Sequence, residues 1–196
     1  MELFLEKKRE RSRPLEDSSY DWSDREHPRY RRIAAYLKRG LPVADSIFDK
    51  IYPAEIAKNS DLHWTPVKVA MMAAKLLSDG SDRRILDVGS GCGKFCLVAS
   101  LTTPGKFVGI ERRKYLNEIA KESAIRLSSS ARFSHEDVFD VDWNYYDGFY
   151  FYNPFYEVKE ADMRIDSSLD GQGVPEFAAY TAATTERLSK LRQNTR

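Results

Sequence analysis

The stretch "ILDVGSGCGKF", Ile85 to Phe95, places three glycines within five positions directly after an apolar run. Glycines in such a loop allow the backbone to turn sharply and to approach a bound molecule closely. Three classes of nucleotide ligand compete for a loop of this kind. The spacing of the glycines, and the acids on either side of them, separate the three.

A triphosphate-binding loop requires the pattern G-x-x-x-x-G-K-[ST]. Lys94 follows Gly93 as that pattern asks, but Val88 stands where the first glycine belongs. Phe95 stands where a hydroxyl would hold magnesium. The sequence therefore excludes a triphosphate loop.

A dinucleotide fingerprint requires G-x-G-x-x-G. Gly89 and Gly91 fit, whereas the third place falls on Lys94. Asp87 would also set a negative charge beside a pyrophosphate. This alternative predicts an oxidoreductase that binds nicotinamide, and the match to it is weak.

The pattern that does fit is D-x-G-x-G-x-G, formed by Asp87, Gly89, Gly91 and Gly93. An acid ahead of the loop suits a cationic ligand, such as one with a sulfonium or an amino group. Glu111, 18 residues past Gly93, ends the second expected strand, where a carboxylate can accept both hydroxyls of a ribose.

Asp137 ends the third expected strand, where an acceptor can meet an adenine amino group. The carboxyl ends of parallel strands form the ligand-binding edge of an open α/β sheet. Three acids at these ends, after a glycine loop, indicate S-adenosylmethionine as the ligand.

Strand and helix patterns alternate after Asp82, which predicts an α/β fold: a Rossmann-like, doubly wound parallel sheet with helices on both faces. We expect strands at 83–89, 106–111, 131–137 and 148–154, and helices at 94–101 and 113–127. A helix follows "HWTP", with Thr65 as its N-cap and Gly80 as its stop. Further helices are expected at 29–39 and at 42–57, where Pro53 divides the second. The resulting division is a polar arm (1–28), a helical extension (29–80) and a core (81–196).

Residues 83–156 resemble the core of the class I S-adenosylmethionine-dependent methyltransferases. "LDVGSGCGK" resembles their first motif, "GIE" the acidic end of their second strand, and "HEDVF" their adenine-side motif. The resemblance implies a methyltransferase with S-adenosylmethionine as cofactor and with its strands in the spatial order 3-2-1-4. The cofactor-binding residues that it implies are Asp87, Gly89, Ser90, Gly91, Gly93, Glu111, Asp137, Val138 and Asn153.

Two further segments resemble parts of amino-methylating members. "HWTP" resembles a cofactor-proximal Thr-Pro segment, which implies that Thr65 lies near the methionine end. "FYFYNPFY" resembles the motif [DNS]-P-P-[YFW]. It implies that Asn153 orients an acceptor amino group, that Pro154 fixes the turn, and that Phe155 or Tyr156 forms a flat wall. The third position is Phe155 rather than proline, and an Asn-Pro pair can also simply turn the chain out of a strand.

The acceptor itself is left open by the sequence: it can be a protein, a nucleic acid or a small molecule. A net charge of +1 indicates no overall attraction to nucleic acid. We assign no metal, and Cys92 and Cys96 are expected to pack under the loop. The N-terminus lacks the features of a signal peptide and no run is long enough to span a bilayer, so we predict a cytoplasmic protein without membrane contact.

The C-terminal region raises a second hypothesis. After Pro154 a polar stretch leads to one helix, without the further strands that this class usually adds. The fourth strand is then an open edge, so we expect either a piece of a longer protein, which we favour, or completion by a partner such as a second copy. In that case the chain is a cofactor-binding module or pseudo-enzyme without turnover.

Overall fold

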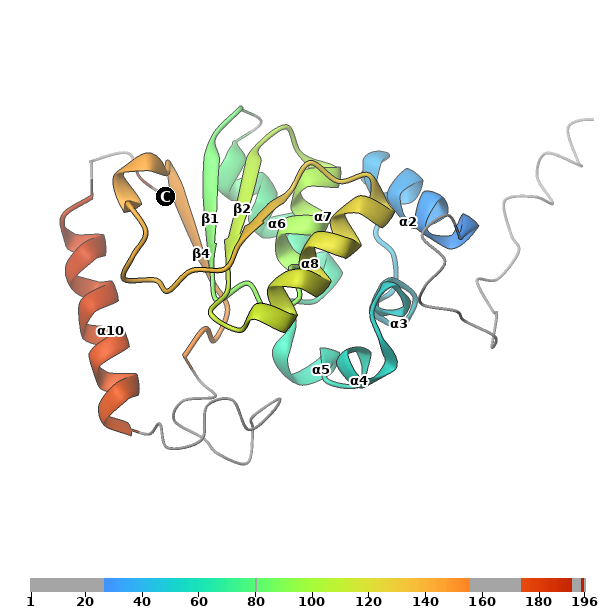
Figure 1. Cartoon of the computed structure of the whole chain (residues 1–196). Coiled ribbons are helices and arrows are strands. Elements are labelled where there is room, and N and C mark those ends of the chain that lie inside the picture. The colour runs from blue at the N-terminus through green and yellow to red at the C-terminus, as the bar shows by residue number, and fades with distance from the viewer. Residues whose placement is uncertain (1–26, 80, 156–173, 192–194, 196) are drawn as a thin grey trace, which may run out of the picture.

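The computed structural model describes residues 27–79, 81–155, 174–191 and 195. The predicted arm lies outside this range apart from its last two residues, as do Gly80 and Tyr156. Within the described range the chain forms three layers, with a parallel sheet between two sets of helices (Figure 1).

The sheet has four strands: β1 (Arg84–Val88), β2 (Lys106–Ile110), β3 (Arg132–Ser134) and β4 (Gly148–Phe151). Their order is β3-β2-β1-β4 and every pairing is parallel, which confirms the predicted topology. In the described residues β4 is one edge of the sheet. β1 is central and buried along nearly its whole length, as expected of a parallel strand covered on both faces.

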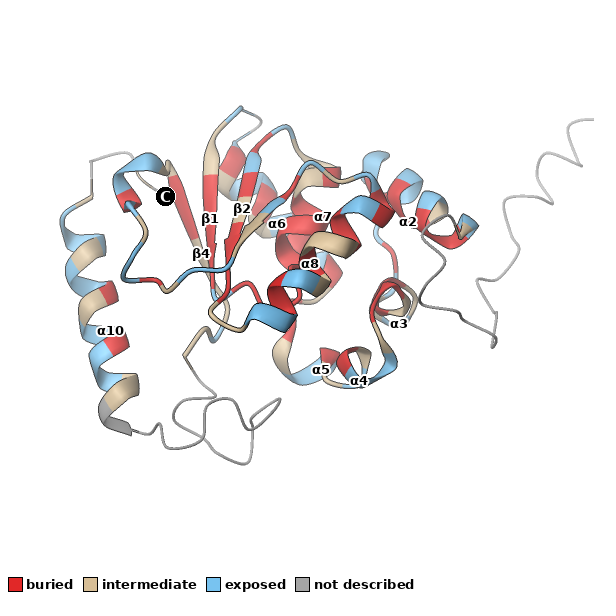
Figure 2. Cartoon of the chain, viewed as in Figure 1, coloured by how far each residue is buried: buried red, intermediate tan, exposed pale blue. Residues whose placement is uncertain are grey.

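One face of the sheet is covered by α6 (Val67–Ser78), α7 (Lys94–Thr102) and α8 (Lys114–Leu127). α7 lies between the other two and also contacts α2 (Pro28–Lys38). Seven of its nine residues are buried, so it is apolar on nearly all sides (Figure 2). Because α7 follows the glycine loop directly, this burial fixes where the loop lies.

The other face is covered in a way that the sequence analysis did not anticipate. Between β3 and β4 the chain forms only a short 3-10 helix, η3 (Trp143–Tyr145), so this connection supplies no long helix to cover the face. The C-terminal helix α10 (Val174–Ser189) lies over this face instead (Figure 1). Tyr180 of α10 joins Leu86, Val88, Ile110, Val138, Trp143 and Phe149 in a second apolar cluster.

The prediction of a helix at 42–57, divided only at Pro53, was wrong. This segment is broken into α3 (Asp45–Phe48), η2 (Asp49–Ile51) and α4 (Ala54–Ala57), and a further short helix, α5 (Ser60–His63), follows. Pro53 begins α4, where its missing N–H costs nothing. These pieces wrap around the N-terminal end of α7.

The predicted N-cap of α6 was also wrong. Pro66 is the N-cap residue, and the Val67 amide donates instead to Asp45 Oδ1 at 2.9 Å. The Thr65 hydroxyl is thereby left for another contact, with the Tyr150 hydroxyl at 3.1 Å. At its other end α6 stops at Asp79, which adopts the left-handed conformation (φ 52°).

β3 is shorter than predicted. It ends at Ser134, so Asp137 lies in the loop beyond the strand rather than at its end. Asp137 Oδ1 accepts from the Phe139 amide at 3.0 Å, which turns the chain away from the sheet. Among the described helices, none is both long and apolar enough to cross a bilayer.

Candidate cofactor and methyl-transfer site

The glycine loop runs directly from β1 into α7. Gly89, Gly91 and Gly93 all have positive φ angles. A Cβ atom on Gly89 would lie 2.8 Å from Pro154 Cβ, and one on Gly91 would lie 2.4 Å from the Trp64 ring. Only glycine fits such contacts, so the loop is pressed between the turn after β4 and the segment before α6.

Glu111, directly after β2, is buried and holds the loop in place. Its Oε2 accepts from the Gly91 amide at 3.0 Å, and its Oε1 accepts from the Arg113 amide and side chain at 2.9 and 3.1 Å. One lone pair of Oε2 is left by these contacts, and Glu111 lines a pocket beside the loop.

Asp87 lies near the end of β1, on the face that α7 covers, and is 3% exposed. Its Oδ2 accepts from the Cys96 thiol at 3.5 Å. Burial raises the pKa of Asp87 to about 7, while the hydrogen bond from Cys96 lowers it and the charge of Glu111 raises it further. Near neutral pH this carboxyl therefore gains or loses a proton readily, and a cationic ligand would favour its charged form.

The segment before α6 closes this side of the loop. His63, Trp64 and Thr65 line one small pocket together with Asp87, Gly89, Ser90, Lys94, Phe95 and Tyr152. Tyr150, whose ring stacks on Phe95 with 3.8 Å between centroids, donates to or accepts from Thr65. Burial raises the pKa of Tyr150 to about 12, so its hydroxyl stays protonated near neutral pH.

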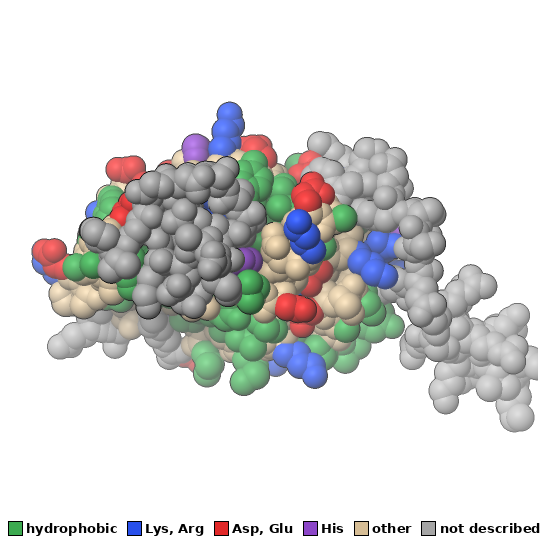
Figure 3. All heavy atoms as spheres, turned by 90° about the horizontal axis from the view of Figure 1, so that it is seen from below, with side chains coloured by type: hydrophobic (Ala, Val, Ile, Leu, Met, Phe, Trp, Pro, Cys, Tyr) green, Lys and Arg blue, Asp and Glu red, His purple; other side chains and the backbone are tan. Residues whose placement is uncertain are grey.

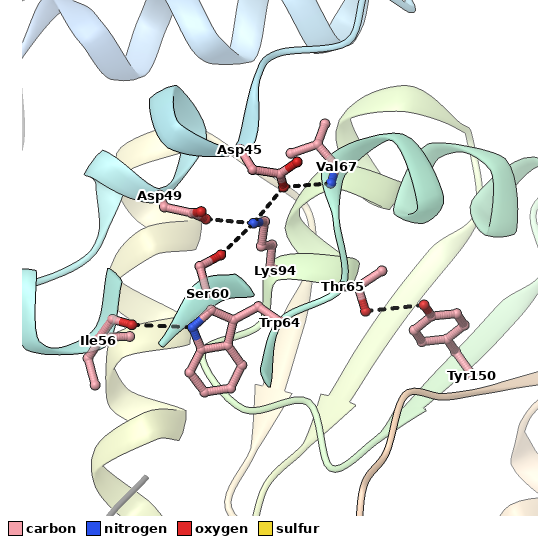
Figure 4. A network of polar contacts seen from close by, with 9 residues as sticks. All are labelled: Asp45, Asp49, Ile56, Ser60, Trp64, Thr65, Val67, Lys94 and Tyr150. Carbon is pink, nitrogen blue, oxygen red and sulfur yellow. Dashed lines mark hydrogen bonds and ion pairs between the residues drawn. The ribbon is translucent and has the colours of Figure 1, made fainter. Parts of the chain in front are cut away.

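Lys94 anchors that segment (Figure 4). Its Nζ, 2% exposed, lies 2.7 Å from Asp45 Oδ1 and 2.7 Å from Asp49 Oδ1, and donates to Ser60 Oγ at 2.9 Å. Asp45 also accepts from the first amide of α6, so one buried cation ties α3, η2, α5 and α6 to the start of α7. The lysine that resembles a phosphate-loop lysine in the sequence is therefore a structural anchor.

Asn153 follows β4 at the same edge of the sheet. It is exposed and has φ 49°, a left-handed conformation that asparagine tolerates better than most residues. Pro154 packs over Gly89. Pro154 and the neighbouring Phe155 also line a second pocket. The turn after β4 and the glycine loop are thus in direct contact.

That second pocket lies on the other side of Gly89. It is lined by Val88, Gly89, Ile110, Glu111, Arg112, Arg113, Glu136, Asp137, Val138, Pro154, Phe155 and Tyr180. Asp137 Oδ2 accepts from the Tyr180 hydroxyl at 2.7 Å, and that hydroxyl accepts from Arg112 Nη1 at 3.0 Å. Burial raises the pKa of Tyr180 to about 12, and the bond to Asp137 also raises it.

Most of the described residues predicted for the cofactor fall into two adjoining pockets that share Gly89, whereas Asn153, Gly91 and Gly93 line neither. Thr65, Asp87 and Ser90 line one, whereas Glu111, Asp137, Val138 and the 154–155 turn line the other. Gly91 and Gly93 shape the loop between Trp64 and Phe133. Tyr156 lies outside the described residues, and the roles of all these residues stay predictions.

The family model of protein-L-isoaspartate (D-aspartate) O-methyltransferases matches residues 42–158, more than half of the chain. The chain belongs to this family. The match begins within the predicted helical extension, and the division at residue 80 stays a prediction. S-adenosylmethionine is accordingly the cofactor that this methyltransferase fold binds.

Individual relatives match this family member over shorter stretches. A ribosomal protein L11 methyltransferase of Dictyoglomus thermophilum is 34% identical over 93 residues, which is 44% of this chain and 30% of the relative. A putative protein N5-glutamine methyltransferase of Methanocaldococcus jannaschii is 27% identical over 107 residues, 55% of this chain and 54% of the relative. The chain thus spans about half or less of the length of these curated relatives.

Solved structures are also similar. An RNA methyltransferase from Salinibacter ruber, in complex with S-adenosyl-L-homocysteine, has a TM-score of 0.41 and 26% identity, covering 45% of this chain and 59% of that one. A protein-L-isoaspartate O-methyltransferase has a TM-score of 0.39 and 17% identity, covering 62% and 47%.

The side chains of this family member fit the cofactor chemically. Ser90 Oγ is buried beside Gly109 of β2 and has no hydrogen-bond partner among the described residues, so its hydroxyl can still donate or accept. Asp87 suits a cationic methionine end, and the lone pair on Glu111 suits a ribose hydroxyl. In the described residues we find no group of His, Cys, Asp and Glu side chains that could hold a metal ion.

Two features of the site have no signal in the sequence that we could have used. Lys94 follows the glycine loop in the sequence, and its ion pairs with Asp45 of α3 and Asp49 of η2 are apparent only in the structure. Tyr180 lies in a helix of mixed polarity, 43 residues from Asp137, with no motif around it. Long-range packing alone brings each of them to the site.

Proposed function

We propose that the chain is an S-adenosylmethionine-dependent methyltransferase whose acceptor is a nitrogen atom positioned by Asn153. The observation that supports this most is the contact of Pro154 with Gly89, which sets Asn153 beside the glycine loop. An amide oxygen there can accept a hydrogen bond from an acceptor N–H and direct its lone pair. Positioning of this kind supplies much of the rate of a displacement reaction.

In this proposal the chain's residues mainly bind and orient. When bound, the cofactor supplies an electrophilic methyl group on a sulfonium. Asp87 and Ser90 hold the methionine end, Glu111 accepts from the ribose, and Asp137 marks the base end. Thr65 and Tyr150 hold each other beside the methionine pocket and keep the wall rigid.

A second acceptor class, a carboxylate, is favoured by the family match. Members of the matched family are named for O-methylation of an aspartyl carboxyl. The names of the two curated relatives, by contrast, point to protein methylation, one of them at glutamine N5. We place a nitrogen atom first as the methyl acceptor, because the Asn153 amide oxygen can accept a hydrogen bond from an N–H group. A carboxylate substrate has no N–H to donate.

The charge pattern at this edge of the sheet does not favour a nucleic-acid acceptor. Figure 3 views the edge where the strands end, and on its visible described surface Lys and Arg side chains are interspersed with Asp and Glu side chains. Phosphate backbones are bound chiefly by clustered cations. A protein acceptor is therefore our preferred class of substrate.

The test is transfer of a radiolabelled methyl group from S-adenosylmethionine to an unmodified protein extract. Methyl esters release their label as methanol in mild base, whereas N-methyl amides and amines keep it. We expect base-stable label on a protein band. Label lost in base would support the carboxylate acceptor, and no label with any acceptor class would support the cofactor-binding module without turnover.

Asn153→Gly is the informative variant, because glycine adopts φ 49° freely and only the amide is removed. We expect label transfer to fall at least tenfold with cofactor affinity unchanged. Asn59→Gly, whose amide donates to Glu55 on the surface, is the matched control and should transfer label normally. Unchanged transfer by Asn153→Gly would refute the assigned role.

A further inference from the structure

Tyr180 of α10 fills the base end of the cofactor pocket. Its ring is buried between two aromatic rings, stacked on Phe139 at 4.7 Å and on Phe155 at 5.1 Å between centroids. Its hydroxyl donates to Asp137 Oδ2 at 2.7 Å and accepts from Arg112 Nη1 at 3.0 Å. A flat ring is therefore held by stacking at its faces and by a carboxylate at its edge.

These are the contacts that an adenine base would use. Adenine presents an amino group that donates hydrogen bonds and a π-face that stacks on aromatic side chains. Asp137 is the acceptor predicted for that amino group, and Phe155 is the aromatic side chain after β4. The Tyr180 hydroxyl already donates to Asp137 Oδ2, so it takes one of the two lone pairs of the oxygen that the amino group is expected to use.

Tyr180 already occupies the contacts that the base is expected to use. The space left beside it is about 40 Å³, which is room for about three water molecules. Its ring stacks on Phe155 and its hydroxyl donates to Asp137. A base that stacks on the same face of Phe155 therefore requires that the Tyr180 ring leave its place.

We propose that α10 is an intramolecular plug, in which Tyr180 competes with the adenine of S-adenosylmethionine for the pocket at Asp137 and Phe155. This inference rests on the proposed function, because it assumes that the cofactor binds at this edge. The plug multiplies the intrinsic affinity for the cofactor by the fraction of molecules in which α10 is undocked, so the apparent affinity is lower.

A second contact, made by a residue that does not itself line the pocket, holds the plug in place. Arg187, two turns further along α10, donates from Nη1 to the Val138 carbonyl at 2.9 Å and from Nη2 to the Phe139 carbonyl at 2.5 Å. Its guanidinium also lies 5.7 Å from the centre of the Trp143 ring. Loss of this anchor should release Tyr180 while leaving every pocket side chain in the sequence, although the Val138 carbonyl loses one donor.

The rival explanation is that Tyr180 is a wall against which adenine stacks. The two predict opposite effects for variants of the full chain, measured by calorimetric titration with S-adenosylhomocysteine. For a plug, we expect Tyr180→Ala and Arg187→Ala to bind on the order of fivefold tighter or more. Tyr180→Phe, which keeps the ring in the core and loses the bond to Asp137, should bind tighter by a smaller factor.

Thr181→Ala is the matched control, because Thr181 is exposed on α10 and its hydroxyl bonds within the helix. Its affinity should equal that of the wild type. Thermal unfolding of each variant checks that the fold is kept, and Tyr180→Phe and Arg187→Ala carry the test if Tyr180→Ala does not fold.

Hydrogen exchange gives an independent result. If α10 is displaced, S-adenosylhomocysteine should speed exchange of the amides at 176–187, whereas a wall would be protected by the ligand. Weaker or unchanged affinity in the Tyr180 and Arg187 variants, or protection of α10, would overturn the plug while the cofactor site stood. Absence of binding by the wild type and by every variant would overturn the proposed function and the plug with it.

Discussion

At Gly91 the loop has no room for a side chain. A Cβ atom would meet the Trp64 ring at 2.4 Å, and φ is 54°. Gly91→Ala combines the strain of a left-handed alanine, about 1–2 kcal/mol, with forced displacement of a buried ring, about 1–3 kcal/mol. We expect chemical denaturation to show a loss of roughly 2–5 kcal/mol.

Gly40→Ala is the control for backbone strain alone. Gly40 has φ 70°, but a Cβ atom there would have no neighbour within 4 Å. The loss of stability in Gly40→Ala should be about 1 kcal/mol. Equal losses at the two positions would show that the Trp64 contact does not constrain the loop.

Asp87 should make stability depend on pH. Its folded-state pKa, about 7, lies above the ordinary value of 3.8, so the folded state favours the protonated carboxyl. The stability that this preference contributes is fully present below about pH 3.8 and is lost as pH rises through about 7. Cys96 and Glu111 are the titratable neighbours that share this environment.

Asp87→Asn is neutral at every pH and should not show this loss. Relative to the wild type, its free energy of unfolding should rise by up to about 4 kcal/mol between pH 4 and pH 8. The same variant should bind S-adenosylhomocysteine more weakly at pH 8. Parallel stability curves for the two proteins would contradict the raised pKa.

Among the elements, the short helices before α6 depend on one cation. Lys94→Met leaves Asp49 buried without its partner, and removal of one member of a buried ion pair costs about 3–5 kcal/mol. We expect a loss of this size in urea unfolding, together with a change in Trp64 fluorescence as the segment over the loop is released.

Lys106→Met is the control, because it removes an ion-paired lysine from the surface rather than from the interior. Lys106 forms an ion pair with Asp82 at 2.7 Å on the surface, where both side chains are mostly exposed. Its replacement should cost no more than about 1 kcal/mol. If Lys94→Met cost as little, the cluster would not be an anchor.

The strands and the principal helices were predictable because their signals are local. Apolar runs mark β1 and β2, periodic patterns mark α7 and α8, and the loop Gly89 to Gly93 separates β1 from α7. Because β1 and β2 pair in parallel, their ends bring Asp87 and Glu111 together. The order of the strands followed from the resemblance in the same residues, and the sheet confirms it.

The elements that failed depend on distant partners. Thr65 was predicted to cap α6, yet Asp45 does so from 22 residues away, and Thr65 bonds Tyr150 instead. Helices were expected on both faces of the sheet, but no local pattern assigned α10 to the second face, which it covers. No local pattern encodes such contacts, because they depend on how elements pack after they form.

At the scale of the whole molecule, the sheet separates two apolar clusters of unequal size. The larger joins α2, α6, α7 and α8, whereas the smaller holds α10 chiefly through Tyr180. Helices with few buried apolar contacts open at lower free energy than the rest of a fold. The element that fills the base pocket is thus also one of the least firmly packed.

The central claim is that this edge of the sheet binds S-adenosylmethionine, and titration with S-adenosylhomocysteine tests it most directly. The wild-type chain and Glu118→Gln, an exposed change on α8, should bind in the micromolar range. Glu111→Gln loses a charged acceptor and should bind at least about tenfold more weakly. A folded wild type that does not bind, or a Glu111→Gln variant that binds as tightly as the wild type, would contradict the account.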